Sequence, residues 1–212
     1  MVNSSLQMDG SRPSLFDFAW PALVLAIFAF SIVSVTGLAW SWYGHLSSFA
    51  ILWGVLFGLV LYAAVYFLSN RYLAHNTEMR RLYRQLTRLF GHLGWPGILL
   101  LSLLAGLGEE MLFRVLLQGG LSQYIGELTA LMVASLAFGL MHFLSKLYVF
   151  VTFVIGLIFG IAYLLTESFL LVATAHFIYD VCAFAVIVKF PNLIGERVTE
   201  RVIESSAENR PE

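Results

Sequence analysis

About six long apolar runs are the feature that most limits what this chain can fold into. A helix needs about 20 apolar residues to cross a hydrocarbon core about 30 Å thick. Of the 212 residues, 59% are hydrophobic and only 12% are charged, whereas about 25% are charged in a soluble domain. The runs are apolar at consecutive positions, unlike the alternating strands of an outer-membrane barrel. We therefore expect an all-α, polytopic membrane protein of about six transmembrane helices: Leu15 to Ala39, Phe49 to Leu68, Trp95 to Gln118, Leu128 to Leu144, Tyr148 to Leu165 and Phe169 to Val188.

Lysine and arginine fall in alternate loops, which predicts the orientation of the spans by the positive-inside rule. Outside the spans, these residues precede the first span, lie in the second loop, or follow the fourth and sixth spans. The intervening loops, at residues 40–48, 119–127 and 166–168, contain neither lysine nor arginine. We expect a multi-pass protein of the cell membrane with both termini cytoplasmic. Arg114 is the one basic residue inside a predicted span.

The same pattern divides the chain into four parts. We expect a polar cytoplasmic tail at residues 1–14, two spans with a basic cytoplasmic loop at 15–94, a membrane domain at 95–190 and a charged cytoplasmic tail at 191–212. In the loop, the segment Asn70 to His92 alternates arginine with apolar residues at near-helical spacing. Such a helix either lies on the cytoplasmic leaflet, basic side toward anionic headgroups, or serves only as a topology anchor.

Apart from Asp17 at the start of the first span, six Asp, Glu, Arg and His side chains lie inside the predicted spans, where each is costly. A charged residue at the bilayer centre costs about 2.5 to 3.5 kcal/mol on insertion scales, so a functional site is the default hypothesis. Taken singly, each also has a structural interpretation, as a packing histidine or as part of a structural ion pair. As a set they predict a site in the core of the bundle, on the third, fourth and sixth spans: Glu109, Glu110, Arg114, His142, His176 and Asp180.

The spacing of these residues indicates how they could converge. Glu110 and Arg114 are four residues apart, as are His176 and Asp180, so each pair shares a helix face. The first pair can neutralise itself, which leaves Glu109, about 100° around the axis, to face another helix. Asp180 can accept a proton from one ring nitrogen of His176 and leave the other nitrogen free. One carboxylate and two imidazoles around a cavity suit attack of an activated water on a carbonyl, which predicts hydrolysis.

At these residues the sequence resembles the CAAX-processing and bacteriocin-immunity family of intramembrane proteases, also called the abortive-infection family. Three motifs of that family, Glu-Glu-x-x-x-Arg, Phe-x-x-x-His and His-x-x-x-Asn/Asp, appear in order within the stretches GLGEEMLFR, AFGLMHF and TAHFIYD. The resemblance covers roughly Trp95 to Phe190 and implies a helical membrane fold. It also implies an endopeptidase that hydrolyses a peptide bond of a membrane-associated peptide or protein. The short chain and small loops are typical of a bacterial protein.

The resemblance further implies a role for each matching residue. The third motif has Asp where the eukaryotic prenyl-protein processors have Asn, so a prenylated substrate is not implied. Glu109 would activate the water, Glu110 and Arg114 would organise the site, His142 and His176 would bind the oxyanion or a metal, and Asp180 would orient or complete the group.

Two cofactor hypotheses stay open at this stage. Glu109, His142 and His176 could hold Zn²⁺ with one open position, as in a metalloprotease, although the sequence has no His-Glu-x-x-His helix. A metal-free glutamate mechanism needs the same groups. The expected partners are a peptide or membrane-protein substrate and the lipid bilayer. Nothing in the sequence points to nucleic acid or fixes the oligomeric state.

Two other functions would use the same residues. Buried carboxylates and histidines also mark ion pathways, so a transporter or proton relay is the first alternative. Neither an inverted repeat nor a matched pair of broken helices is apparent in the sequence, which counts against it. The second alternative is a non-catalytic bacteriocin-immunity or scaffold protein, whose effect would survive loss of Glu109 and His176.

Overall fold

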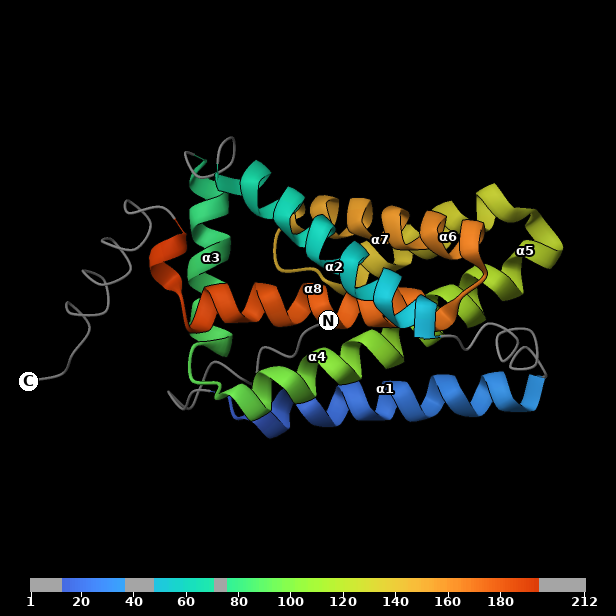
Figure 1. The fold of residues 1–212 in the computed structure, drawn as a ribbon, viewed down its shortest axis with the longest axis horizontal. Coiled ribbons are helices and arrows are strands. Elements are labelled where there is room, and N and C mark those ends of the chain that lie inside the picture. Colours follow the sequence, from blue (N-terminus) through green and yellow to red (C-terminus); the bar gives the residue numbers. More distant parts are fainter. Residues whose placement is uncertain (1–12, 37–47, 71–75, 195–212) are drawn as a thin grey trace, which may run out of the picture.

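The structure, a computed structural model, describes residues 13–36, 48–70 and 76–194, and the regular elements within these ranges are all helices. The predicted tails at residues 1–12 and 195–212, and the end of the first predicted span, lie outside the described residues. Figure 1 shows the helices in the order α1 (Leu15–Thr36), α2 (Ser48–Leu68), α3 (Thr77–Phe90), α4 (Trp95–Glu110), η5 (Met111–Gly119), α5 (Gly120–Ile125), α6 (Glu127–Met141), α7 (Lys146–Thr166), α8 (Phe169–Val188) and η6 (Pro191–Leu193).

Four of these helices, α1, α2, α7 and α8, are long and apolar enough to cross a membrane. They also keep large apolar side chains on the outer surface of the bundle, among them Trp20, Ile27, Trp53 and Phe150. A helix that is apolar on all sides and still exposed needs an apolar solvent. The chain is therefore a membrane protein, and the prediction of an all-α polytopic fold is confirmed.

The third predicted span combines two kinds of helix. The α-helix α4 ends at Glu110 and runs directly into η5, a π-helix from Met111 to Gly119. The predicted helical span from Trp95 to Gln118 is therefore helical throughout. The sequence did not indicate its π turns, because apolar composition does not distinguish α turns from the wider π turns. Such π segments often occur at functional sites, and this one begins directly after Glu110.

Pairs of glycines bring the long helices into close contact. Gly54 and Gly58 of α2 face α8, and a Cβ atom added at Gly54 would lie 2.7 Å from the Leu171 carbonyl oxygen. Gly156 and Gly160 of α7 face α6 in the same way, with a Cβ at Gly156 placed 3.2 Å from the Phe138 ring. Both are small-xxx-small pairs, with small residues four positions apart, and such pairs allow helix axes to approach closely.

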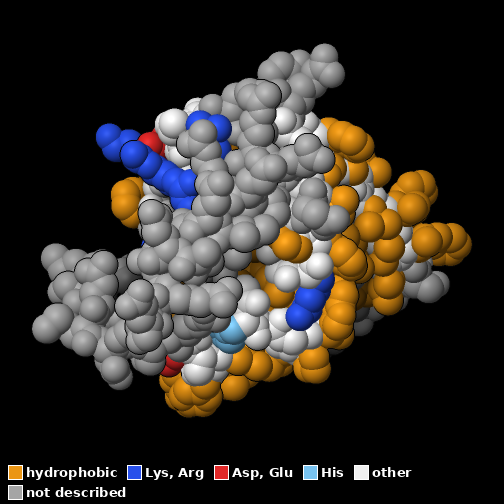
Figure 2. Space-filling model, turned by 90° about the vertical axis from the view of Figure 1, so that its left-hand side faces the viewer, with side chains coloured by type: hydrophobic (Ala, Val, Ile, Leu, Met, Phe, Trp, Pro, Cys, Tyr) orange, Lys and Arg blue, Asp and Glu red, His pale blue; other side chains and the backbone are white. Residues whose placement is uncertain are grey.

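Helix α3 lies across one end of the bundle, at a steep angle to the long helices (Figure 1). It begins where the Asn76 side chain accepts a hydrogen bond of 2.8 Å from the Glu78 backbone N–H, an N-cap contact. Met79 and Leu82 are buried against the bundle. The end-on view shows lysine and arginine side chains on this face of the molecule, with hydrophobic side chains along its edge (Figure 2). The sequence prediction of an amphipathic helix here is confirmed.

Candidate active site

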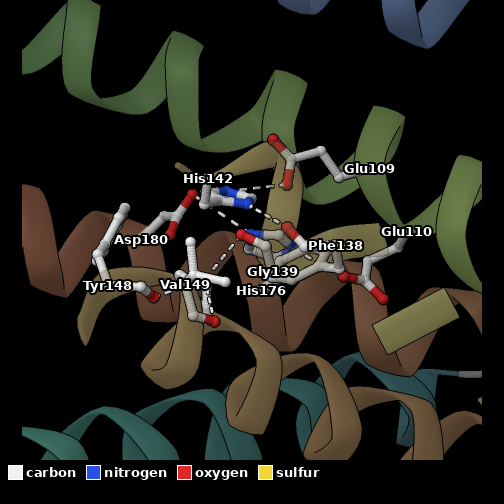
Figure 3. Close-up of polar contacts among 10 residues, drawn as sticks. Glu109, Glu110, Phe138, Gly139, His142, Tyr148, Val149, His176 and Asp180 are labelled. Atoms are coloured by element: carbon white, nitrogen blue, oxygen red, sulfur yellow. Dashed lines mark hydrogen bonds and ion pairs between the residues drawn. The ribbon is translucent and has the colours of Figure 1, made fainter. Parts of the chain in front are cut away.

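The structure brings the six predicted polar residues together inside the bundle. Figure 3 shows five of them, and the sixth, Arg114, is paired with Glu110. Glu109 and Glu110 end α4, and Arg114 lies in the first turns of η5. His142 directly follows α6, and His176 and Asp180 lie on α8. Contacts between His142 and Glu109 and between His176 and Glu110 join different helices, and His176 also approaches Asp180 along α8. The site has a buried part and a part that faces a cavity.

The buried part is centred on Glu110, whose side chain is completely buried. One carboxylate oxygen accepts a hydrogen bond of 3.1 Å from Arg114 Nε, and the other accepts one of 2.8 Å from His176 Nδ1. Arg114 is also completely buried, and its guanidinium carbon lies 5.5 Å from the centre of the Phe138 ring. Because a buried charge is tolerated only when it is paired, Glu110 and Arg114 require each other. Their pairing spans the junction of α4 and η5, and the His176 contact connects this junction to α8.

His142 is held by the end of helix α6. The predicted span continued to Leu144, but α6 ends at Met141, and His142 occupies the C-cap with φ −90° and ψ 30°. Its Nδ1–H donates to the Phe138 carbonyl at 2.9 Å, one of the carbonyl groups that a helix end leaves unpaired. This bond fixes the tautomer, so Nε2 carries the free lone pair of a neutral His142. That nitrogen lies 3.6 Å from Glu109 Oε2.

The Glu109 carboxylate has a buried oxygen without a hydrogen-bond partner. Oε2 makes no hydrogen bond within the described ranges, although it is shielded from solvent. Buried polar atoms are nearly always hydrogen-bonded, to protein or to ordered water. Together with the nearby His142 Nε2, this oxygen marks a position suited to a polar group or a water molecule.

Both ring nitrogens of His176 face carboxylates. Nδ1 donates to Glu110, and Nε2 lies 3.5 Å from Asp180 Oδ2. The sequence had suggested that Asp180 fixes this ring and leaves its other nitrogen free, but Glu110 occupies that nitrogen. The Phe159 ring stacks on the imidazole at 5.2 Å between centroids. His176 is therefore a buried bridge between two carboxylates from α4 and α8.

A cavity of about 310 Å³ reaches the site from the end of the bundle where α3 lies. Glu109, His142 and Asp180 line its wall, and so does Tyr148, whose ring is 6.1 Å from that of His142. The remaining three predicted residues lie behind this wall and are buried: Glu110, Arg114 and His176. Only the first group can therefore touch a molecule held in the cavity.

Comparison with known proteins finds a similar family over part of the chain. Residues 91–182, which include all six polar residues, match the profile of the family described as type II CAAX prenyl endopeptidase Rce1-like. Over this part the chain is similar to the Rce1-like family. Over 129 residues the chain is 37% identical to YpbD of Bacillus subtilis (strain 168), a protein described as uncharacterized. That alignment covers 59% of this chain and 62% of YpbD. No solved structure matches the chain significantly.

Three more residues within 91–182 contribute to the site, although they were not predicted as site residues: Gln118, Phe138 and Gly160. The Gln118 side chain is buried. Its Oε1 accepts a hydrogen bond of 3.4 Å from Arg114 Nη1, and its Nε2 donates one of 2.9 Å to the Gly160 carbonyl oxygen. Phe138, matched only as a motif position, packs its ring against both His142 and His176. A signal for Gln118 was present in the sequence, because it is a polar residue four positions after Arg114 inside an apolar span. The sequence did not indicate a role for Gly160, because a glycine that packs closely against another helix does not stand out as a polar residue in an apolar span.

Gly160→Ala tests whether this packing supports the site. The added Cβ would clash with Leu131 Cδ1 and lie 2.8 Å from Gln118 Oε1 and 3.1 Å from Arg114 Nη1. We expect a loss of about 1–3 kcal/mol in stability from overpacking, measured as a lower melting temperature in detergent, together with reduced activity. Gly94→Ala is the matched control, because its Cβ would meet only Pro96 Cδ, at 3.5 Å. Equal melting temperatures for the two variants would contradict the role of Gly160.

The residues that the sequence suggested as Zn²⁺ ligands do not gather into a metal site here. Within residues 13–36, 48–70 and 76–194, no group of three or more His, Cys, Asp or Glu side chains is arranged to hold a metal ion. His176 has both ring nitrogens directed at carboxylates, which leaves neither aimed at the pair formed by Glu109 and His142. The zinc hypothesis stays a prediction, and no step of the mechanism below depends on a metal.

Proposed function

We propose that this protein is an intramembrane endopeptidase that uses Glu109 to activate a water molecule for attack on a peptide bond. The observation that carries the proposal is the unpartnered, buried Oε2 of Glu109 on the cavity wall, 3.6 Å from His142 Nε2. The similarity of residues 91–182 to the Rce1-like family supports a proteolytic reaction. A carboxylate and an imidazole that face one cavity are the groups a general-base hydrolysis needs.

In the proposed reaction, water bound between Glu109 and His142 loses a proton to the Glu109 carboxylate. The resulting hydroxide attacks the carbonyl carbon and forms a tetrahedral intermediate. His142 Nε2 shares this proton with Glu109, because its other nitrogen is already engaged by the Phe138 carbonyl. A protonated Nε2 can donate to the oxyanion. The proton then passes to the leaving nitrogen as the C–N bond breaks, which restores both groups.

The other polar residues keep this pair in place. Glu110 and Arg114 fix the junction of α4 and η5, which determines where the neighbouring Glu109 points. His176 connects that junction to α8, and Asp180, which lies 3.5 Å from His176 Nε2, lines the cavity wall. In this assignment Glu109 and His142 are the catalytic residues. Asp180 and Tyr148 line the substrate cavity, and the buried residues are positioning residues.

The proposed substrate is a peptide or membrane protein that reaches the cavity from the membrane or from the end where α3 lies. The cavity wall is mainly apolar and aromatic, with Tyr62, Tyr66, Phe90 and Phe184 among its side chains. Such a lining favours apolar residues next to the scissile bond. We place the protein in the cell membrane as a multi-pass protein, with the α3 end cytoplasmic, because the lysines and arginines gather at that end.

His142→Ala tests the proposal directly. Purified protein is incubated with a library of membrane peptides, and the products are mapped by mass spectrometry. We expect cleavage to fall at least about a hundredfold, since the variant removes the group that shares the proton with Glu109. His92→Ala is the matched control, because His92 is exposed. Cleavage that is unchanged in the His142 variant would refute the role of this residue.

Adding a chelator to the same assay separates the two cofactor hypotheses. Undiminished cleavage would favour the metal-free glutamate mechanism. Loss of cleavage that Zn²⁺ reverses would instead assign a metal to the residues around Glu109 and His142.

A further inference from the structure

One face of α3 is basic along its whole length. Arg80, Arg84 and Arg88 follow one another at intervals of four residues, so they form a single row along the helix. At 1.5 Å per residue this row is about 12 Å long. Arg81 lies beside it and is paired with Glu78 at 3.1 Å, the one ion pair that a described acidic side chain makes on this helix. Within the described part of the chain, no acidic side chain is paired with the three residues of the row.

The opposite face of α3 forms part of the wall of the catalytic cavity. Met79, Leu82, Tyr83, Leu86 and Phe90 all line the same cavity as Glu109 and His142. Burial raises the pKa of the Tyr83 hydroxyl, so this side chain stays uncharged in the wall. A movement of α3 would consequently change the shape of the cavity, because one helix carries both the basic row and the wall.

The orientation of α3 suits a position along a membrane surface. The helix crosses the end of the bundle at a steep angle to the long apolar helices (Figure 1), so in a membrane crossed by those helices its axis would run along the surface, near the lipid headgroups. Arg80 and Arg84 are half-buried while Arg88 is exposed, as expected when long side chains lie along the protein and extend their charged ends to the interface. Hydrophobic side chains border this end of the molecule (Figure 2).

We propose that the row Arg80, Arg84 and Arg88 binds the headgroups of anionic phospholipids, and that this binding orders α3 as a wall of the cavity. An acidic membrane surface attracts each nearby arginine by about 1 kcal/mol, which is roughly a fivefold change in affinity for each charge. A soluble acidic partner would need a contoured surface to fit, whereas a headgroup layer lies parallel to this helix. The inference does not depend on the chemistry proposed for Glu109.

Hydrogen–deuterium exchange of the full chain in lipid nanodiscs tests the proposal without a substrate. The parent protein is compared in discs of phosphatidylcholine alone and in discs that also contain phosphatidylglycerol. We expect amide exchange in α3 to slow at least about fivefold when phosphatidylglycerol is present. We expect this difference to vanish when all three residues of the row are changed to glutamine, and to persist when all three are changed to lysine.

A single-charge comparison controls for a general effect of charge. Arg84→Gln removes the unpaired residue at the centre of the row, whereas Arg81→Gln removes one that Glu78 already neutralises. We expect the lipid effect to weaken in the first variant and to be retained in the second. Equal exchange of the parent protein in both kinds of disc would overturn the proposal. Equal slowing by inorganic phosphate in phosphatidylcholine discs would overturn the membrane surface as the partner.

Discussion

Glu109→Gln is expected to reduce peptide cleavage by about a hundredfold to ten-thousandfold, the range that general-base catalysis contributes. The amide is nearly isosteric with the carboxylate but cannot take a proton from water. Since Oε2 of Glu109 makes no hydrogen bond to the described protein groups, its replacement breaks none and should leave the fold unchanged. The measurement is the cleavage rate of a library-selected peptide, with the melting temperature recorded alongside.

A second carboxylate provides the matched control for this variant. Glu127 begins α6 and lines a separate cavity of about 210 Å³, together with Glu167 and Gln118. The Glu127→Gln variant should cleave the same peptide at the parental rate. If Glu109→Gln kept full activity against a peptide that the parent cleaves, the proposed mechanism would be wrong. If both variants lost activity together, a general loss of negative charge would be the better explanation.

Arg114→Met is expected to lower the free energy of unfolding by about 3–5 kcal/mol, the usual cost of breaking a buried ion pair. Both partners are completely buried, so the substitution would leave the Glu110 charge with only His176 as a partner. The measurement is the melting temperature of the purified protein. The double variant that also carries Glu110→Leu should recover part of the loss, because no buried charge is then left unpaired.

The exposed pair on α3 offers a control of the same chemistry. Arg81 and Glu78 are also 3.1 Å apart, but their side chains are 68% and 50% exposed. Arg81→Met should therefore change stability by less than about 1 kcal/mol. If the two arginine variants lost equal stability, burial would not be the reason that Glu110 depends on Arg114.

The sequence predicted those parts of the fold that depend on composition and on spacing along one helix. The apolar runs indicated the helices, and the four-residue intervals indicated that Glu110 would meet Arg114 and that His176 would approach Asp180. It could not predict that Glu110 also binds His176, because that contact depends on how α4 and α8 pack. Nor could it assign His142 to a helix end, since the residues that follow remain apolar as far as Leu144.

Two further features had no recognisable pattern in the sequence. The cavity wall formed by α3 depends on where an amphipathic helix docks, and its apolar face could equally have entered the lipid. The division of the six residues into a cavity-facing group and a buried group depends on helix rotation. Glu109 and Glu110 are neighbours in the chain, yet only Glu109 reaches the cavity.

The π turns of η5 have a consequence for changes in chain length. A π turn contains more residues than an α turn, so this segment holds residues that a regular helix of the same rise would not need. Deleting one residue from a regular α-helix rotates the residues beyond it by about 100°. A deletion between Met111 and Gly119 differs, because a π turn that loses its surplus residue closes into an α turn. Glu110 and Gln118 would then keep their directions toward the centre of the bundle, so this segment tolerates a loss of length that the regular helices around it would not.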